Sequence, residues 1–184
     1  MYFSGPKYKK AMKELDVQPV SEKTYNKCLG LFVACHILER GGRVGYFSCM
    51  KVGELKQARE YEDQRLLQII AEEQKIRDEV GFLTMSREDY EMFLKLVNMF
   101  QNIKDRDDKE YALGTPSKKQ MRVDKCVRSA LAKVFGESIS ITLMRKMTET
   151  LASSMPESQQ RDVARALGHS VEIAQKTKLS EKTI

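Results

Sequence analysis

The side chains that could do chemistry are few and lie far apart along the chain. His169 follows Leu-Gly and precedes a serine at an expected junction between two helices, where a side chain can face a ligand. Arg43 follows a Gly-Gly pair, and Arg145 lies on an expected helix whose face is partly apolar. Lys75 lies at the tip of an expected hairpin. Each residue also fits an ordinary turn or surface position, so none identifies a site by itself.

Several well-defined kinds of site are absent from the sequence. It contains no Gly-rich phosphate loop and no HExxH, GxSxG or CxxC motif. The four cysteines lack paired metal-ligand spacing, and we expect reduced thiols because no secretion signal is evident. His36 lies on the apolar side of an expected helix, where a core histidine is the better interpretation. The sequence therefore predicts neither a metal site nor a small-molecule cofactor.

Length and composition favour one globular domain. The chain has 184 residues and a net charge of +6, from 32 Lys or Arg and 26 Asp or Glu. Hydrophobic residues make up 41%, enough for a core without disulfides. No apolar run approaches the roughly 20 residues that span a bilayer, and the N-terminus does not resemble a signal peptide. We therefore expect an intracellular protein, nuclear or cytoplasmic, with no membrane partner, whose charge permits contact with nucleic acid.

The elements that must position these residues can be predicted from apolar spacing. We expect residues 1–20 to form a loose basic arm, because they combine glycine, prolines and many lysines. Apolar residues at helical spacing predict a helix over 21–40, with Ser21 as its N-cap. A short helix is expected after Arg43, and residues 66–71 and 80–85 have strand-like patterns that predict a β-hairpin.

The second half of the chain is predicted to be mostly helical. Ser86 begins the clearest helical stripe, and the charged segment 104–120 is expected to be a solvated connector. Helices are then expected over 121–135, ended by Gly136, over 141–151, and from Pro156 to Gly168. These elements together predict an α+β fold, a helical body with one small antiparallel sheet near residues 52–85.

Four segments, taken in order, resemble the motifs of the tyrosine recombinases, or phage integrase family. They are RVGYFSCMKVGEL (43–55), IIAEEQK (69–75), ITLMRKMTETLA (141–152) and LGHS (167–170). The resemblance covers roughly residues 21–180 and is nearest to divergent animal integrase-like proteins of transposable elements. It implies a single catalytic domain over 21–184, without the separate core-binding domain that precedes it in the family.

The resemblance implies a role for each candidate residue. Arg43 and Arg145 would hold the phosphate oxygens, where their charge is most useful in the transition state. Lys75 would protonate the leaving 5′ oxygen, and His169 would contact the phosphate or transfer a proton. In the family a tyrosine attacks the phosphate and forms a 3′-phosphotyrosine during DNA recombination and integration. The implied partner is double-stranded DNA, on which family members form homo-oligomers.

Three positions depart from the family pattern. Lys178 stands where the nucleophilic tyrosine is expected, and no tyrosine follows Tyr111. Thr142 replaces a usual His or Lys, and Tyr46 replaces a usual acidic residue. We therefore expect a domain that binds DNA but does not cleave it alone. The chain could be a repurposed recombinase, its tyrosine could have been replaced, or a tyrosine could come from another subunit.

Two other functions compete with this interpretation. A non-enzymatic helical protein-interaction module would use its ten methionines in core packing and would expose an apolar groove. RNA binding rests on charge alone, because the chain has no Trp and no aromatics interleaved with basic residues. A basic cleft that joins the candidate residues would favour the recombinase interpretation over both.

Overall fold

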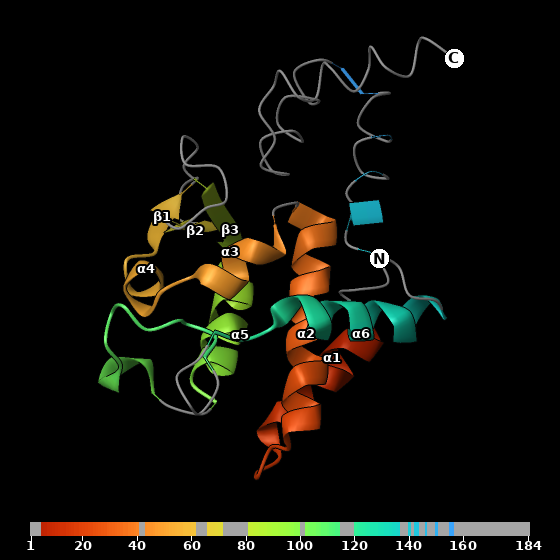
Figure 1. The fold of residues 1–184 in the computed structure, drawn as a ribbon, viewed down its shortest axis with the longest axis horizontal. Helices are drawn as coiled ribbons and strands as arrows, with labels where there is room; N and C mark the ends of the chain where they lie inside the picture. The colour runs from red at the N-terminus through yellow and green to blue at the C-terminus, as the bar shows by residue number, and fades with distance from the viewer. Residues whose placement is uncertain are drawn as a thin grey trace.

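The computed structural model describes residues 5–40, 43–61, 66–71, 81–99, 102–114 and 120–136, with positions 140, 142, 143, 146, 150, 155 and 156. The fold combines helices with a small antiparallel sheet (Figure 1). Its helices and strands are α1 (Pro6–Lys13), η1 (Glu14–Asp16), α2 (Glu22–Arg40), α3 (Val44–Cys49), α4 (Val52–Lys56), β1 (Arg59–Tyr61), β2 (Leu66–Ala71), β3 (Gly81–Ser86), α5 (Arg87–Val97), η2 (Ile103–Asp105) and α6 (Val123–Phe135).

Helix α2 is the centre of the helical body, and the predicted helix over 21–40 is confirmed. Its N-cap is Ser21, whose Oγ accepts a hydrogen bond from the Thr24 N–H at 3.1 Å. Helix α6 crosses α2 at close range (Figure 1). The crossing is tight because Gly30 lies against the Cys126 carbonyl, where a Cβ would be only 2.2 Å from the oxygen. A glycine is therefore required at this point of α2.

The predicted hairpin is also confirmed. Strand β2 pairs antiparallel with β3, with Ile69 opposite Leu83, and the short strand β1 extends the sheet on the other edge of β2. One face of the sheet is in the core, because Ile69, Leu83 and Met85 are buried. Helix α5 follows β3 directly, and the Ser86 Oγ accepts a hydrogen bond from the Asp89 N–H, as an N-cap should.

Three phenylalanines join α2, α3 and α5 into one core. The rings of Phe32 and Phe93 are stacked with their centroids 5.6 Å apart. The Phe47 ring meets Phe93 edge-on, also at 5.6 Å. All three side chains are buried, so this cluster fixes the start of α3 relative to the two longer helices.

The N-terminal segment differs from the loose arm predicted for residues 1–20. Pro6 begins helix α1, a position that proline tolerates because its missing N–H needs no partner there. Ala11, Met12 and Leu15 are buried against the body, and Leu15 is only 1% exposed. The prediction was wrong because the lysines lie on the solvent side of a helix whose opposite side is apolar.

Helix α6 agrees with its predicted apolar stripe. Val123, Val127 and Leu131 are fully buried, and Gly136 ends the helix with a φ of +75°. The helices predicted beyond Gly136 fall almost entirely outside the described residues. Among the described residues, no helix has the length and apolar character needed to cross a membrane.

Candidate nucleic-acid interface

Arg43 is the one predicted site residue that the structure describes. It is the N-cap of α3 in extended conformation, with φ −115° and ψ 140°, and its carbonyl accepts a hydrogen bond from the Tyr46 N–H at 3.0 Å. Its side chain is half-buried and makes contacts of its own. Val44 and Phe47 anchor α3 in the core immediately after it. The backbone of Arg43 is therefore held at the start of α3.

The position expected to support Arg43 with an acid holds Tyr46. This side chain is 6% exposed and belongs to the hydrophobic core cluster. A phenol is uncharged at neutral pH, so it cannot hold an arginine by charge. The local environment of Arg43 thus differs in charge from the one that the family pattern implies.

His36 is a core residue, as the sequence predicted. It is 6% exposed, and its ring packs edge-on against Phe47 with the centroids 5.3 Å apart. The histidine helps to fill the space between α2 and α3.

The other four predicted site residues lie outside the described part of the chain. Lys75 falls in the connection between β2 and β3, and Arg145, His169 and Lys178 follow α6. Thr142, which departs from the family pattern, is described and exposed. The convergence of Arg43 with the other four residues therefore stays a prediction.

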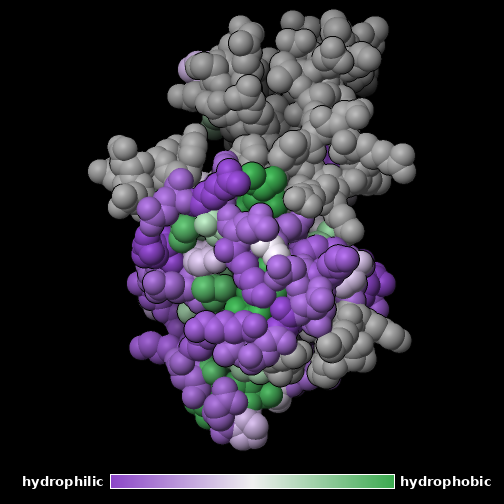
Figure 2. All heavy atoms as spheres, turned by 90° about the vertical axis from the view of Figure 1, so that its left-hand side faces the viewer, coloured by the Kyte–Doolittle hydropathy of each residue, from purple (hydrophilic) through white to green (hydrophobic). Residues whose placement is uncertain are grey.

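The sheet, α4 and the loop 102–114 share a predominantly hydrophilic face (Figure 2). A hollow of about 510 Å³ on these elements is lined by Lys51, Gly53, Glu54, Gln57, Arg59, Ile70, Asp108 and Lys109. Three cations and two carboxylates thus surround it. Arg59 and Lys109 have no ion-pair partner among the described residues, and such groups can bind phosphate oxygens.

Lys51 is positioned by the loop that faces it. Its ammonium nitrogen lies 3.6 Å from the centroid of the Tyr111 ring, a cation–π arrangement. The backbone N–H of Lys51 donates to the Glu54 carboxylate at 2.7 Å, which fixes the start of α4. The lysine is therefore held at the rim of the hollow.

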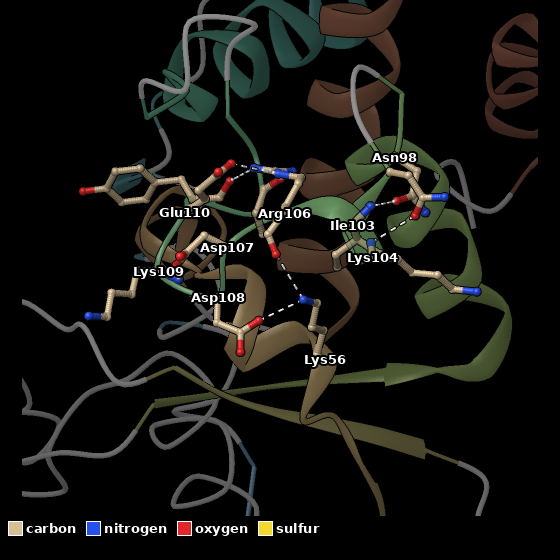
Figure 3. Close-up of polar contacts among 12 residues, drawn as sticks. Lys56, Asn98, Ile103, Lys104, Arg106, Asp107, Asp108, Lys109 and Glu110 are labelled. Carbon is tan, nitrogen blue, oxygen red and sulfur yellow. Dashed lines mark hydrogen bonds and ion pairs between the residues drawn. The ribbon is translucent and has the colours of Figure 1, made fainter.

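A buried arginine organises the loop 102–114 (Figure 3). The Arg106 guanidinium donates to the carbonyls of Tyr111 and Ala112, the latter at 3.0 Å, and to the Glu110 carboxylate at 3.3 Å. Its side chain is only 7% exposed. Five donors in a fixed fork can satisfy several buried acceptors at once. The solvated connector predicted for 104–120 is confirmed where five charged residues are exposed: Lys104, Asp105, Asp107, Asp108 and Lys109. It is wrong at Arg106, Ala112 and Leu113, which are buried.

The same loop is tied to α4. The Val52 N–H donates to the Glu110 carbonyl at 2.9 Å, and the Gly53 N–H donates to the Asp108 carbonyl at 3.0 Å. Lys56 reaches across to the Asp108 carboxylate at 2.9 Å (Figure 3). These contacts hold the two walls of the hollow together. Sequence analysis missed the hollow because its residues come from separate segments, and no local pattern marks them.

The arrangement suits the binding of an anion better than the binding of a cation. The described residues contain no group of His, Cys, Asp and Glu that could hold a metal ion. Cations outnumber carboxylates by three to two around the hollow, which favours an anion there. The wider face of the sheet, α4 and the loop 102–114 is balanced in charge, because Glu60, Asp105, Asp107 and Glu110 also lie on these elements.

Comparisons with known proteins identify no relative. The chain matches no family model, and no curated protein or solved structure matches it.

Proposed function

We propose that this chain is a DNA-binding domain of the tyrosine-recombinase type, in which Lys178 occupies the position of the nucleophile. The proposal rests above all on the order of Arg43, Lys75, Arg145 and the LGHS segment along the chain. Double-stranded DNA would be its partner, reached in the nucleus or cytoplasm, and copies of the chain would assemble on it. Strand cleavage would require a tyrosine at position 178.

The placement of Arg43 supports this proposal. A residue that binds a phosphate oxygen must be held still, because misplacement reduces its value in the transition state. Arg43 is the N-cap of a helix, α3, that Phe47 anchors in the aromatic core. The antiparallel strands on either side of Lys75 support a second part of the pattern, because the family places its lysine in such a sheet.

The hydrophilic face with its hollow adds a surface for the DNA backbone. Arg59 and Lys109 would contact phosphates without reading bases, which contributes affinity and register but no sequence specificity. Binding through phosphates releases counterions, so the affinity should fall steeply as salt rises.

Duplex DNA binding of the full chain, measured by fluorescence anisotropy against salt concentration, tests this proposal. We expect Arg43→Ala to weaken binding at every salt concentration and to reduce the slope of log affinity against log salt by about one. Arg128→Ala is the matched control, because Arg128 is exposed on α6 and already bonded to Asp124. Absence of duplex binding at low salt, or equal weakening by both variants, would contradict the proposal.

A further inference from the structure

A second hollow, of about 430 Å³, lies where α1, α2 and α6 meet, away from Arg43 and the sheet. Its lining is predominantly apolar and consists of Tyr8, Lys10, Ala11, Glu14, Lys27, Leu31, Ser129, Ala130, Lys133 and Val134. It is a half-open groove with three helical walls. The proposed contacts with DNA use none of these residues.

The groove exists because small side chains form its floor. Ala11 of α1 and Ala130 of α6 are buried there, at 4% exposure each. Leu31 and Val134 rise beside them and remain half-exposed. Covering this apolar floor and its half-exposed aliphatic walls with further apolar side chains would be favourable, because it removes apolar surface from water.

The rim of the groove is positively charged. Lys27 and Glu14 neutralise each other through an ion pair, with N–O distances of 2.7 and 2.8 Å to the two carboxylate oxygens. Lys10 on α1 and Lys133 on α6 are exposed, and neither has an ion-pair partner among the described residues. Uncompensated cations therefore stand on two opposite walls of an apolar groove.

We propose that this groove binds an acidic amphipathic helix of a partner protein. Leucine-like side chains would fill the space above Ala11 and Ala130, and carboxylates beside them would pair with Lys10 and Lys133. The chain's own residues 137–184 complement this rim poorly, because they carry seven Lys or Arg against six Asp or Glu. Charge complementarity therefore favours a different, acidic chain.

The test uses the full chain and a defined probe. The probe is a capped helical peptide of about 15 residues with leucines along one face and glutamates beside them, a length at which an isolated helix can form. Amide chemical shifts of the protein are followed by NMR during titration. We expect the largest shifts around Ala11, Leu31, Ala130 and Val134, and no binding of a peptide in which lysines replace the glutamates.

Charge-reversal variants separate this groove from general attraction to a basic protein. The double change Lys10→Glu and Lys133→Glu should weaken binding of the acidic peptide about tenfold, because two attractions become repulsions. The matched control is Lys9→Glu with Lys125→Glu, on the same two helices and with the same change in charge, at exposed positions outside the groove. The control should weaken binding less than twofold.

Three results would overturn the proposal. The acidic peptide could leave the groove amides unshifted, which would mean that the groove is filled by the chain itself or is not a binding surface. Equal weakening of peptide binding by the two double variants would mean that the peptide is attracted by the net charge of the protein and not by this groove. Groove shifts that depend on protein concentration without peptide would make a second copy of this chain the occupant.

Discussion

The crossing of α2 and α6 makes Gly30→Ala the most informative single change for the fold. The new Cβ would lie 2.2 Å from the Cys126 carbonyl oxygen and 2.6 Å from its carbon, where ordinary contact begins at 3.4 Å. The two backbones would have to move apart by about 1.2 Å. Backbone atoms cannot rotate away as a side-chain tip can, so the whole crossing must open.

Two opposing effects set the change in the free energy of unfolding that Gly30→Ala causes. Overpacking of a buried contact costs about 3 kcal/mol when the structure must shift, at the upper end of its usual range. Replacement of a helical glycine by alanine stabilises the folded state by about 1 kcal/mol, because alanine has the higher helix propensity. We therefore expect Gly30→Ala to lower the free energy of unfolding by about 2 kcal/mol, measured by urea denaturation followed by circular dichroism.

Gly45→Ala is the matched control. Gly45 also lies in a helix, α3, but it is exposed, and a Cβ there would meet nothing within 4 Å. Only the propensity term applies, so this variant should be more stable than the parent by about 0.5 to 1 kcal/mol. If Gly30→Ala were as stable as Gly45→Ala, the reasoning about the α2–α6 crossing would be refuted.

Three further predictions concern the loop, the thiols and the start of α6. Arg106→Ala should lower the free energy of unfolding by about 3 kcal/mol in urea denaturation, because it leaves a partly buried carboxylate and two carbonyls without their donor. Mass spectrometry after alkylation at pH 8 should find Cys49 modified before Cys28, because Cys28 is buried and burial raises the pKa of its thiol to about 11. A hydrogen bond from Arg122 lowers the pKa of Asp124 from 3.8 to about 2, so its stabilisation is present above pH 4 and is lost as pH falls toward 2. Melting temperatures between pH 2 and 5 should therefore depend less on pH in Asp124→Asn than in the parent.

Each of these predictions has a result that would contradict it. Lys104→Ala, in the same loop but exposed, should change the free energy of unfolding by less than about 0.5 kcal/mol. If Arg106→Ala had an equally small effect, the hydrogen bonds of the Arg106 guanidinium would contribute little to stability. Modification of Cys28 first would show that the contact between α1 and α2 opens readily. An unchanged pH profile in Asp124→Asn would show that its bonds to the arginines are screened by solvent.

Periodicity along the sequence predicted the elements whose structure depends on near neighbours. Ser86 with the apolar stripe after it indicated α5, and Gly136 marked the end of α6, because capping and amphipathicity are local properties. The strands around Ile69 and Leu83 were equally visible, since β-branched residues between charged turns favour a hairpin.

The features that sequence analysis missed depend on residues far apart. Nothing near Arg106 indicates that it is buried, because its acceptors become available only when the loop folds against α4. Helix α1 was hidden by its lysines, which mask the apolar side formed by Ala11 and Met12. Both hollows combine residues from three or more elements, and such combinations leave no local pattern.

The central claim is that the chain has the DNA site of a tyrosine recombinase without its nucleophile. The most direct test is to trap a covalent protein–DNA adduct on a nicked suicide substrate, with the parent chain, Lys178→Tyr, and Lys178→Tyr combined with Arg43→Ala. We predict an adduct with Lys178→Tyr and with neither of the other two chains, because only that variant has both a nucleophile and the arginine that we propose holds the phosphate. No adduct with Lys178→Tyr under conditions in which it binds the substrate would contradict the claim.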